Sequence, residues 1–443
     1  MQQQKKKTTV SQSEALYARA LDVMPGGCSR NTVLRKPQPL YVACGEGCYV
    51  TDIEGIKRID FANNMASLIH GHAHPEVVAA VTAQLQKGSA FTLATEVEID
   101  YAEHLCSRND GFDQLRFVNS GTEAVMSCLK AARAFTGRAK IAKVEGAYHG
   151  LYDYAEVSQT ANPKNWGDAN KPVSVPVSHG TPASALNDVV VIPFNDIERS
   201  ISILGQHADE LACVLLDLIP HRVGLVEASQ SYVKALHQWT RDNQALLVCD
   251  EVITFRSKYG GAQTGYDVLP DLTAMGKMIG GGFPVGALAG RRDVMDVMNP
   301  LADKVLFPHS GTFSANPVTM TAGLVSMELF DVAAVEAINR LAEVTRYRIS
   351  EAIALADIPA CVTGSGSMFR IHMKPEAPIN YRDAFVSPEE AKIVKALLDH
   401  LFDNGIIMIG TCTGMLSTVM TEREIDILCD VLLAGFRKIK PMF

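Results

Sequence analysis

Hydrophobic and polar positions follow a block pattern through the middle of the chain. Short apolar runs at 114–119, 211–219 and 245–252 are separated by stretches with helical apolar spacing, at 122–137 and 231–244. Short buried strands that alternate with helices are typical of a mostly parallel sheet covered by helices. The pattern therefore predicts an α/β fold with one large central sheet.

The two ends of the chain show different patterns. Residues 45–61 alternate apolar and polar positions around Glu54-Gly55, which predicts a β-hairpin or meander. From about Ser326 the chain has long helical patterns, at 333–356 and 388–405, with short strands between them. We expect the N-terminal meander to pack with this C-terminal part in a smaller, discontinuous α/β domain. The expected segments are 1–65 and 326–443 for the small domain and 66–325 for the large domain.

Length and charge narrow the class of protein. The chain has 443 residues, is 47% hydrophobic and carries a formal net charge of -8. A protein with this negative net charge has no electrostatic attraction for nucleic acid or an anionic membrane, and we expect neither as a partner. The basic run Lys5-Lys6-Lys7 is interpreted as a solvated tail and not as a targeting signal, and the 10 cysteines form no CxxC pair. We therefore expect a reduced, cytoplasmic enzyme.

Two segments in the predicted large domain have residues suited to a charged ligand. Ser120-Gly121-Thr122 lies between a predicted strand and a predicted helix, where free backbone N–H groups and small residues suit a phosphate. An ordinary helix cap explains the same residues. Asp250 follows the apolar run 245–249, at the strand end where α/β proteins place ligands, and a buried carboxylate there could hold a protonated heterocycle. A strand-end carboxylate facing water is the alternative.

A lysine and a histidine run complete the candidates. Lys277 is flanked by Met275, Met278 and Ile279 and is followed by three glycines, so a partly apolar pocket could lower its pKa and make it a nucleophilic amine. A surface lysine beside a flexible loop is the alternative. The alternating histidines of the segment 70–74 lie next to Gly71 and Pro75, which favour a loop, and we expect no metal site there.

Together these segments resemble the class-III aminotransferases, the fold-type-I pyridoxal-phosphate enzymes that include glutamate semialdehyde aminomutase. The resemblance extends from about Met24 to the C-terminus and depends on the order and spacing of several motifs. These motifs are "PGGCSRNTV", "HGHAHPEV", "LRFVNSGTEAVMSCLKAARAFTGRAKIAKVEGAYHG", "LLVCDEVITFR", "DLTAMGKMIGGGFPVGALAGR" and "HSGTFSANP".

The resemblance implies a role for each motif residue. Lys277 matches the lysine that forms a Schiff base with the cofactor, and Asp250 matches the aspartate that keeps the pyridine nitrogen protonated. Val252 and Tyr148 match the residues on the two faces of the cofactor ring. Thr312 matches a threonine that reaches the phosphate of the neighbouring subunit, which implies a homodimer. The phosphate cup is implied to be Ser120, Gly121 and Thr122.

Departures from the family pattern concern the substrate. Asp217-Leu218 stands where many relatives have Glu-Pro, and the following loop, 220–224, lacks the usual small residues. "DEVITFR" is one residue shorter than the aminomutase form, and this feature and the context of Arg30 resemble β-amino-acid aminotransferases. In those enzymes the arginine that matches Arg30 binds the substrate carboxylate, and Arg222 and Arg256 are competing candidates. The segment "IGTCTGMLST" lacks an arginine that the β-phenylalanine enzyme has nearby.

The sequence thus predicts a transaminase that moves an amino group between an amino acid or amine and a keto acid, with a β-amino acid among the candidate donors. An aminomutase of the glutamate-semialdehyde type and a racemase remain open, because they share all the cofactor residues. A non-catalytic binding protein of the same fold is a further alternative, which the intact Lys277 and Asp250 disfavour.

Overall fold

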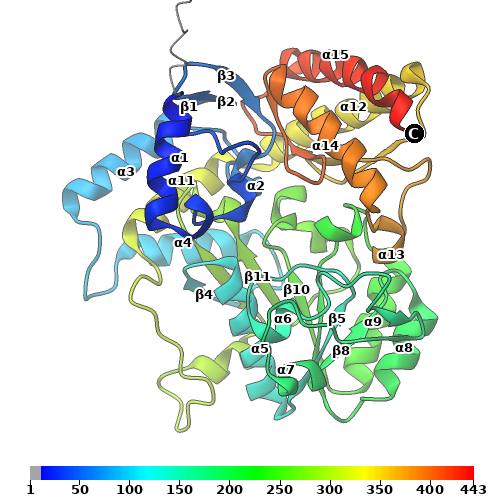
Figure 1. Cartoon of the computed structure of the whole chain (residues 1–443). Coiled ribbons are helices and arrows are strands. Elements are labelled where there is room, and N and C mark those ends of the chain that lie inside the picture. Colours follow the sequence, from blue (N-terminus) through cyan, green and yellow to red (C-terminus); the bar gives the residue numbers. More distant parts are fainter. Residues whose placement is uncertain (1–10) are drawn as a thin grey trace, which may run out of the picture.

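The computed structural model describes residues 11–443 (Figure 1). The basic run Lys5-Lys6-Lys7 lies outside these residues. The described part is an α/β structure with one large sheet, smaller sheets and helices around them, and it confirms the predicted fold class.

A seven-stranded sheet forms the centre of the structure, with strand order β4-β12-β11-β10-β9-β5-β8. All neighbouring strands are parallel except for β12, which is antiparallel to both β11 and β4. The strands are β4 (Gln114–Val118), β5 (Lys140–Val144), β8 (Val189–Ile192), β9 (Leu211–Leu216), β10 (Leu246–Asp250), β11 (Leu272–Gly276) and β12 (Gly286–Gly290).

Helices cover the large and the small sheets and fill the connections between strands. They are α1 (Gln12–Val23), α2 (Asn63–Ala66), α3 (Pro75–Lys87), α4 (Glu96–Ser107), α5 (Gly121–Thr136), α6 (Asp153–Glu156), α7 (Ala183–Asn187), α8 (Ile197–Gly205), α9 (Gln230–Asp242), α10 (Arg292–Met295), α11 (Pro317–Leu329), α12 (Val332–Ala356), α13 (Tyr381–Ala384), α14 (Pro388–Asp403) and α15 (Glu422–Ile439). Within residues 11–443, no single helix is long and apolar enough to cross a membrane, whereas α11 and α12 pass that test only as a pair bent by 71°.

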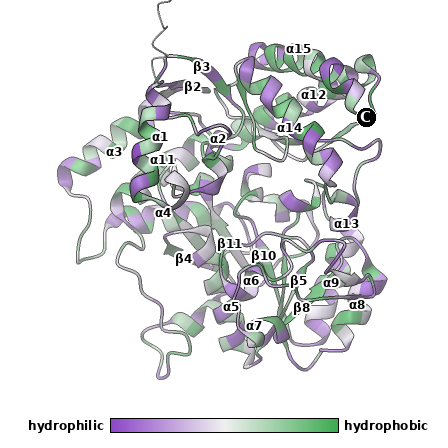
Figure 2. Ribbon diagram, in the orientation of Figure 1, coloured by the Kyte–Doolittle hydropathy of each residue, from purple (hydrophilic) through white to green (hydrophobic). Residues whose placement is uncertain are grey.

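Side chains of β10 alternate between two hydrophobic cores, as successive residues of a strand must. Leu247 belongs to the core that contains Trp239 of α9, and Val248 belongs to the core that contains Leu129 of α5. Figure 2 shows hydrophobic residues concentrated along the strands of the central sheet. Because both faces of β10 are buried, its whole sequence is apolar up to Asp250, where the strand ends.

A second, smaller sheet joins the two ends of the chain. The predicted meander is present as β1 (Val42–Glu46), β2 (Tyr49–Asp52) and β3 (Lys57–Asp60), which pair antiparallel in sequence order. β3 also pairs in parallel with β15 (Ile406–Ile407), next to α14 and α15 (Figure 1). The remaining strands are β6 (Gly167–Asp168), β7 (Lys171–Pro172), β13 (Cys361–Thr363), β14 (Met368–His372) and β16 (Thr413–Met415).

Segments from both ends of the chain thus share one sheet, and the division into a large domain and a discontinuous small domain stays a prediction. The predicted boundary between residues 325 and 326 falls inside the continuous helix α11, so the position of that boundary stays a prediction.

Candidate functional site

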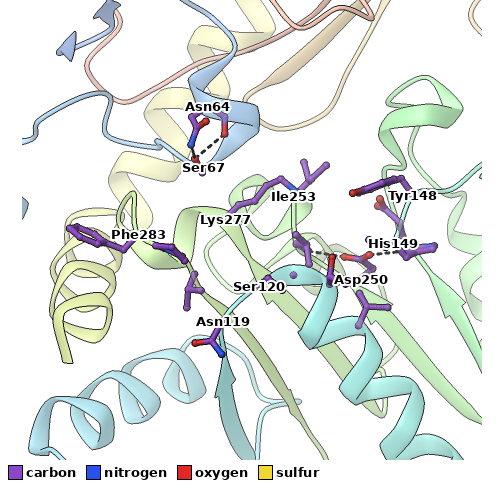
Figure 3. Close-up of a pocket in the computed structure, with 18 of the residues that line it drawn as sticks. Asn64, Ser67, Asn119, Ser120, Tyr148, His149, Asp250, Ile253, Lys277 and Phe283 are labelled. Carbon is purple, nitrogen blue, oxygen red and sulfur yellow. Dashed lines mark hydrogen bonds and ion pairs between the residues drawn. The ribbon is translucent and has the colours of Figure 1, made fainter. Parts of the chain in front are cut away.

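A cavity of about 520 Å³ lies at the carboxyl ends of the central strands (Figure 3). It is the place where parallel α/β sheets present ligand-binding residues, because strand ends and helix N-termini meet there. The cavity brings together eight of the predicted site residues, which are Arg30, Ser120, Gly121, Thr122, Tyr148, Asp250, Val252 and Lys277. Residues separated by more than two hundred positions in the sequence thus line one cavity.

Asp250 is held firmly at the end of β10. The residue is only 5% exposed, its Oδ1 accepts a hydrogen bond from the Val252 backbone N–H at 2.9 Å, and its Oδ2 lies 2.6 Å from Nδ1 of His149. The adjacent Glu251 has a different task, since it accepts hydrogen bonds from the backbone N–H groups of Ala262 and Gln263. Of the two neighbouring acids, only Asp250 lines the cavity.

His149 is a site residue that the sequence reasoning missed. Burial lowers the pKa of its imidazole, while the Asp250 carboxylate opposes that shift. Because a carboxylate only accepts hydrogen bonds, Nδ1 must carry the hydrogen that lies between His149 and Asp250. His149 Nε2 is buried and has no partner within residues 11–443. The available signal was its place beside Tyr148, in the short loop that follows the buried strand β5.

Lys277 directly follows β11 and has a backbone φ of 50°, in the left-handed region that residues other than glycine seldom adopt. Burial lowers the pKa of its amine, and the charges of Asp250 and Asp217 oppose this shift. A lowered pKa leaves more of the amine unprotonated and therefore nucleophilic. Strained backbone at such a position is typical of functional sites.

The N-terminus of α5 forms the predicted anion cradle. Ser120 caps the helix, and its hydroxyl accepts a hydrogen bond from the Glu123 N–H at 3.1 Å, so the cap interpretation is also correct. The N–H groups of Gly121 and Thr122 belong to the first turn, where no intrahelical acceptor exists. A Cβ added at Gly121 would lie 2.7 Å from Cγ1 of Val252, so only glycine keeps this approach open.

The structure separates the three candidate arginines. Arg30 lines the cavity, and its Nη1 donates to Oδ1 of Asn64 at 2.8 Å. The Arg222 guanidinium lies outside the lining, 5.6 Å from the centre of the Tyr148 ring. Arg256 is completely buried and donates to Ser367 Oγ and to a backbone carbonyl, which makes it a structural residue.

Thr312 does not line this cavity. It lies in an exposed loop before α11, and its predicted contact with a neighbouring subunit stays a prediction. Two histidines of segment 70–74 have polar partners, since His70 hydrogen-bonds to Thr418 and to the Ser326 carbonyl, and His72 Nε2 lies 2.9 Å from Asp60 Oδ2. Within the part of the chain that the structure describes, no group of three or more potential metal ligands occurs.

The sequence of the chain is similar to those of a known protein family. The model of the family "Aminotransferase class-III" matches residues 32–434. A glutamate-1-semialdehyde 2,1-aminomutase of Methanothermobacter thermautotrophicus is 38% identical over 373 residues, which are 84% of this chain and 86% of that protein.

Solved structures give the same family. An omega-transaminase from Sphaerobacter thermophilus is 44% identical, with a TM-score of 0.95, over 97% of this chain and 98% of the other. A β-phenylalanine aminotransferase from Variovorax paradoxus is 30% identical, with a TM-score of 0.85, over 95% of this chain and 93% of the other.

The cavity residues suit the cofactor of this family. Asp250 offers a carboxylate for a pyridine nitrogen, Lys277 offers an amine for an aldehyde, and Gly121 leaves room for a phosphate at a helix N-terminus. The chain therefore belongs to the class-III aminotransferases, which are enzymes of fold type I that use pyridoxal 5'-phosphate.

Proposed function

We propose that the enzyme is a transaminase that moves an amino group between an amino acid or amine and a keto acid. The observation that carries the proposal is Arg30, a cation that lines the same cavity as Lys277 and Asp250. A guanidinium binds a carboxylate at two points, so Arg30 can orient an amino acid toward the Lys277 amine. The similarity to an omega-transaminase and to a β-phenylalanine aminotransferase supports the same reaction class and keeps a β-amino acid among the donors.

In the proposed reaction, each residue performs one step that its position allows. Lys277 Nζ acts first as a general base, which removes a proton from the substrate carbon that bears the amino group. It then acts as a general acid and delivers the proton to the cofactor carbon to which the amino group is transferred. Pyridoxal phosphate supplies an electron sink for the negative charge that proton removal creates. Asp250 holds a proton on the pyridine nitrogen and thereby maintains that sink, and His149 orients the Asp250 carboxylate.

The binding roles complete the proposal. Ser120, Gly121 and Thr122 hold the phosphate at the N-terminus of α5. Val252 and Tyr148 contact the two faces of the ring. Thr312 of a second subunit completes the phosphate site, so we propose a homodimer as the active form.

A donor screen tests the reaction class. The cofactor-loaded enzyme is supplied with α-amino acids, β-phenylalanine and a carboxylate-free amine, each with pyruvate or 2-oxoglutarate as acceptor. A transaminase forms a new amino acid from the acceptor. Absence of transfer from every donor would contradict the proposal and would leave an aminomutase, a racemase or a protein that binds the cofactor without turnover.

Arg30→Ala tests the substrate carboxylate. It should raise the Michaelis constant for an amino acid and leave that for a carboxylate-free amine almost unchanged. Arg35→Ala is the matched control, because Arg35 lies in the same segment but pairs with Asp399 and does not line the cavity. Equal losses on both substrates would show that Arg30 has a structural role, and no loss on either would favour Arg222.

An aminomutase is the second candidate, because several glutamate-1-semialdehyde 2,1-aminomutases match most of the chain at 32–38% identity. An aminomutase exchanges the amino group within one substrate and needs no external keto acid. Incubation with glutamate-1-semialdehyde alone distinguishes the two candidates, since only the aminomutase forms its isomer without an added acceptor. A racemase would instead invert an amino acid at its stereocentre, again without an acceptor.

A further inference from the structure

Asp217 is a second acid at the carboxyl ends of the central strands. In the parallel register of β9 and β10, Leu216 lies opposite Cys249, so Asp217 and Asp250 follow at the same level on neighbouring strands. Cys213 and Leu215 of β9 belong to the core under α5, as Val248 of β10 does. Alternation therefore directs both acids to the same side of the sheet, and both line the cavity.

The surroundings of the two acids differ. Asp250 contacts His149 and the Val252 N–H, whereas Asp217 accepts one hydrogen bond, from the Ile219 N–H at 2.9 Å to its Oδ1. Within residues 11–443, no lysine, arginine or histidine forms an ion pair with Asp217, although the residue is only 6% exposed.

The acidic charges near Asp217 act in the same direction as its burial. Burial is the largest cause that raises the pKa of Asp217 well above the usual range of a carboxyl group, followed by the charge of Asp250. Glu251 adds to this effect, while Lys277 opposes it. Two carboxylates at neighbouring positions cannot both ionise readily, and the one with more hydrogen-bond donors keeps the charge. The remaining proton therefore belongs to Asp217.

The order of the strands decides which edge of the cofactor meets Asp217. Gly121, in the phosphate cradle, lies against Gly276 of β11 and Val252, whereas Asp217 follows β9, on the opposite side of β10. In pyridoxal phosphate, the phosphate arm and the phenolic oxygen stand on opposite sides of the axis from the ring nitrogen to the carbon that joins lysine. With the ring nitrogen at Asp250, the phenolic oxygen is on the side of Asp217.

We propose that Asp217 is a neutral carboxyl group in the loaded enzyme and that it donates a hydrogen bond to the phenolic oxygen of the cofactor. The inference depends on the cofactor-binding part of the proposed function, and it holds for a transaminase and an aminomutase alike. A donor at this oxygen draws negative charge from it. The Lys277 nitrogen, once bonded to the cofactor, then becomes less basic, because the adjacent oxygen attracts its proton less.

Two variants test the contact through the absorbance of the loaded protein as a function of pH. Asp217→Asn keeps a neutral donor, so the midpoint of the absorbance change should stay at the wild-type pH. Asp217→Leu removes the donor and should raise the midpoint by about one pH unit, as expected for the loss of a hydrogen bond to a charged group.

The opposite results would overturn the proposal. A midpoint lowered by the Asn variant would show that Asp217 carries a negative charge in the wild type. A wild-type midpoint in the Leu variant would show that Asp217 does not contact the oxygen.

Infrared spectroscopy gives a second measurement that needs neither turnover nor the Leu variant. The loaded wild type should show the carbonyl band of a protonated carboxyl group, and Asp217→Asn should lose this band. Absence of the band in the wild type would refute the neutral state. Because neither measurement requires a substrate, failure of the transaminase proposal would leave this test intact.

Discussion

Replacement of Asp250 by asparagine is the most informative perturbation of the site. Asparagine keeps the size of the side chain, and its carbonyl oxygen can still accept from the Val252 N–H. Its NH2 group can donate to Nδ1 of His149 once the ring hydrogen moves to Nε2, but asparagine has no charge with which to hold a proton on the pyridine nitrogen. The protein fold should therefore persist while the electron sink weakens.

The size of the effect follows from the burial of Asp250. At 5% exposure, an effective dielectric constant of about 20 is appropriate, and two unit charges about 4 Å apart then attract each other by about 4 kcal/mol. Each ~1.4 kcal/mol lost from the transition state slows the reaction about tenfold. We therefore expect Asp250→Asn to lower kcat about a thousandfold and to weaken cofactor binding much less.

The assay compares kcat per loaded active site with thermal unfolding of the same samples. Glu251→Gln is the matched control, because this neighbouring acid faces the backbone of residues 262–263 and not the cavity. It should lower the unfolding temperature and leave kcat per folded site nearly unchanged. An Asn variant with kcat within about tenfold of the wild type would show that the Asp250 charge contributes little.

Three other changes test separate parts of the structure. Lys277→Ala should abolish turnover with the fold intact, and borohydride should attach the cofactor to Lys277 of the wild type; a label on another lysine would contradict the assignment. Thr312→Val should weaken cofactor retention in a dimer, and light scattering that shows a fully active monomer would refute the shared site. Burial lowers the pKa of Lys143 from 10.5 to about 7, so its protonation disfavours the folded state below about pH 7, and this cost disappears as pH rises toward 10.5. Stability measured by denaturant unfolding should thus rise with pH over that window in the wild type but not in Lys143→Met; parallel pH profiles would refute this assignment.

Local sequence patterns predicted the strands and helices well because burial on both faces of β10 leaves an apolar run that any reader can recognise. The antiparallel insertion of β12 between β4 and β11 could not be predicted, since it depends on contacts between segments far apart in the chain. Periodicity carries no information about such pairings.

Site residues could be predicted where they belong to a motif with several unusual residues. A residue whose role is to position another side chain could not be predicted in this way. Asp250 and Lys277 stand out within their motifs, whereas His149 contacts Asp250 only after β5 and β10 have been brought together. The sequence context of Arg30 already favoured it among the three arginines, and the structure adds that Arg256 is completely buried whereas Arg30 lines the cavity.

The pairing of β3 with β15 has a consequence for the synthesis of the protein. Ile59 pairs with Ile406, so the ribosome releases one strand long before the other exists. At about 5–20 residues per second, the interval lasts roughly 20 to 70 seconds. During this time one edge of β3 has free backbone donors and acceptors, which can pair with strands of other nascent chains. A stop codon anywhere before β15 would make this exposure permanent, so truncated forms should aggregate even when the large domain is complete.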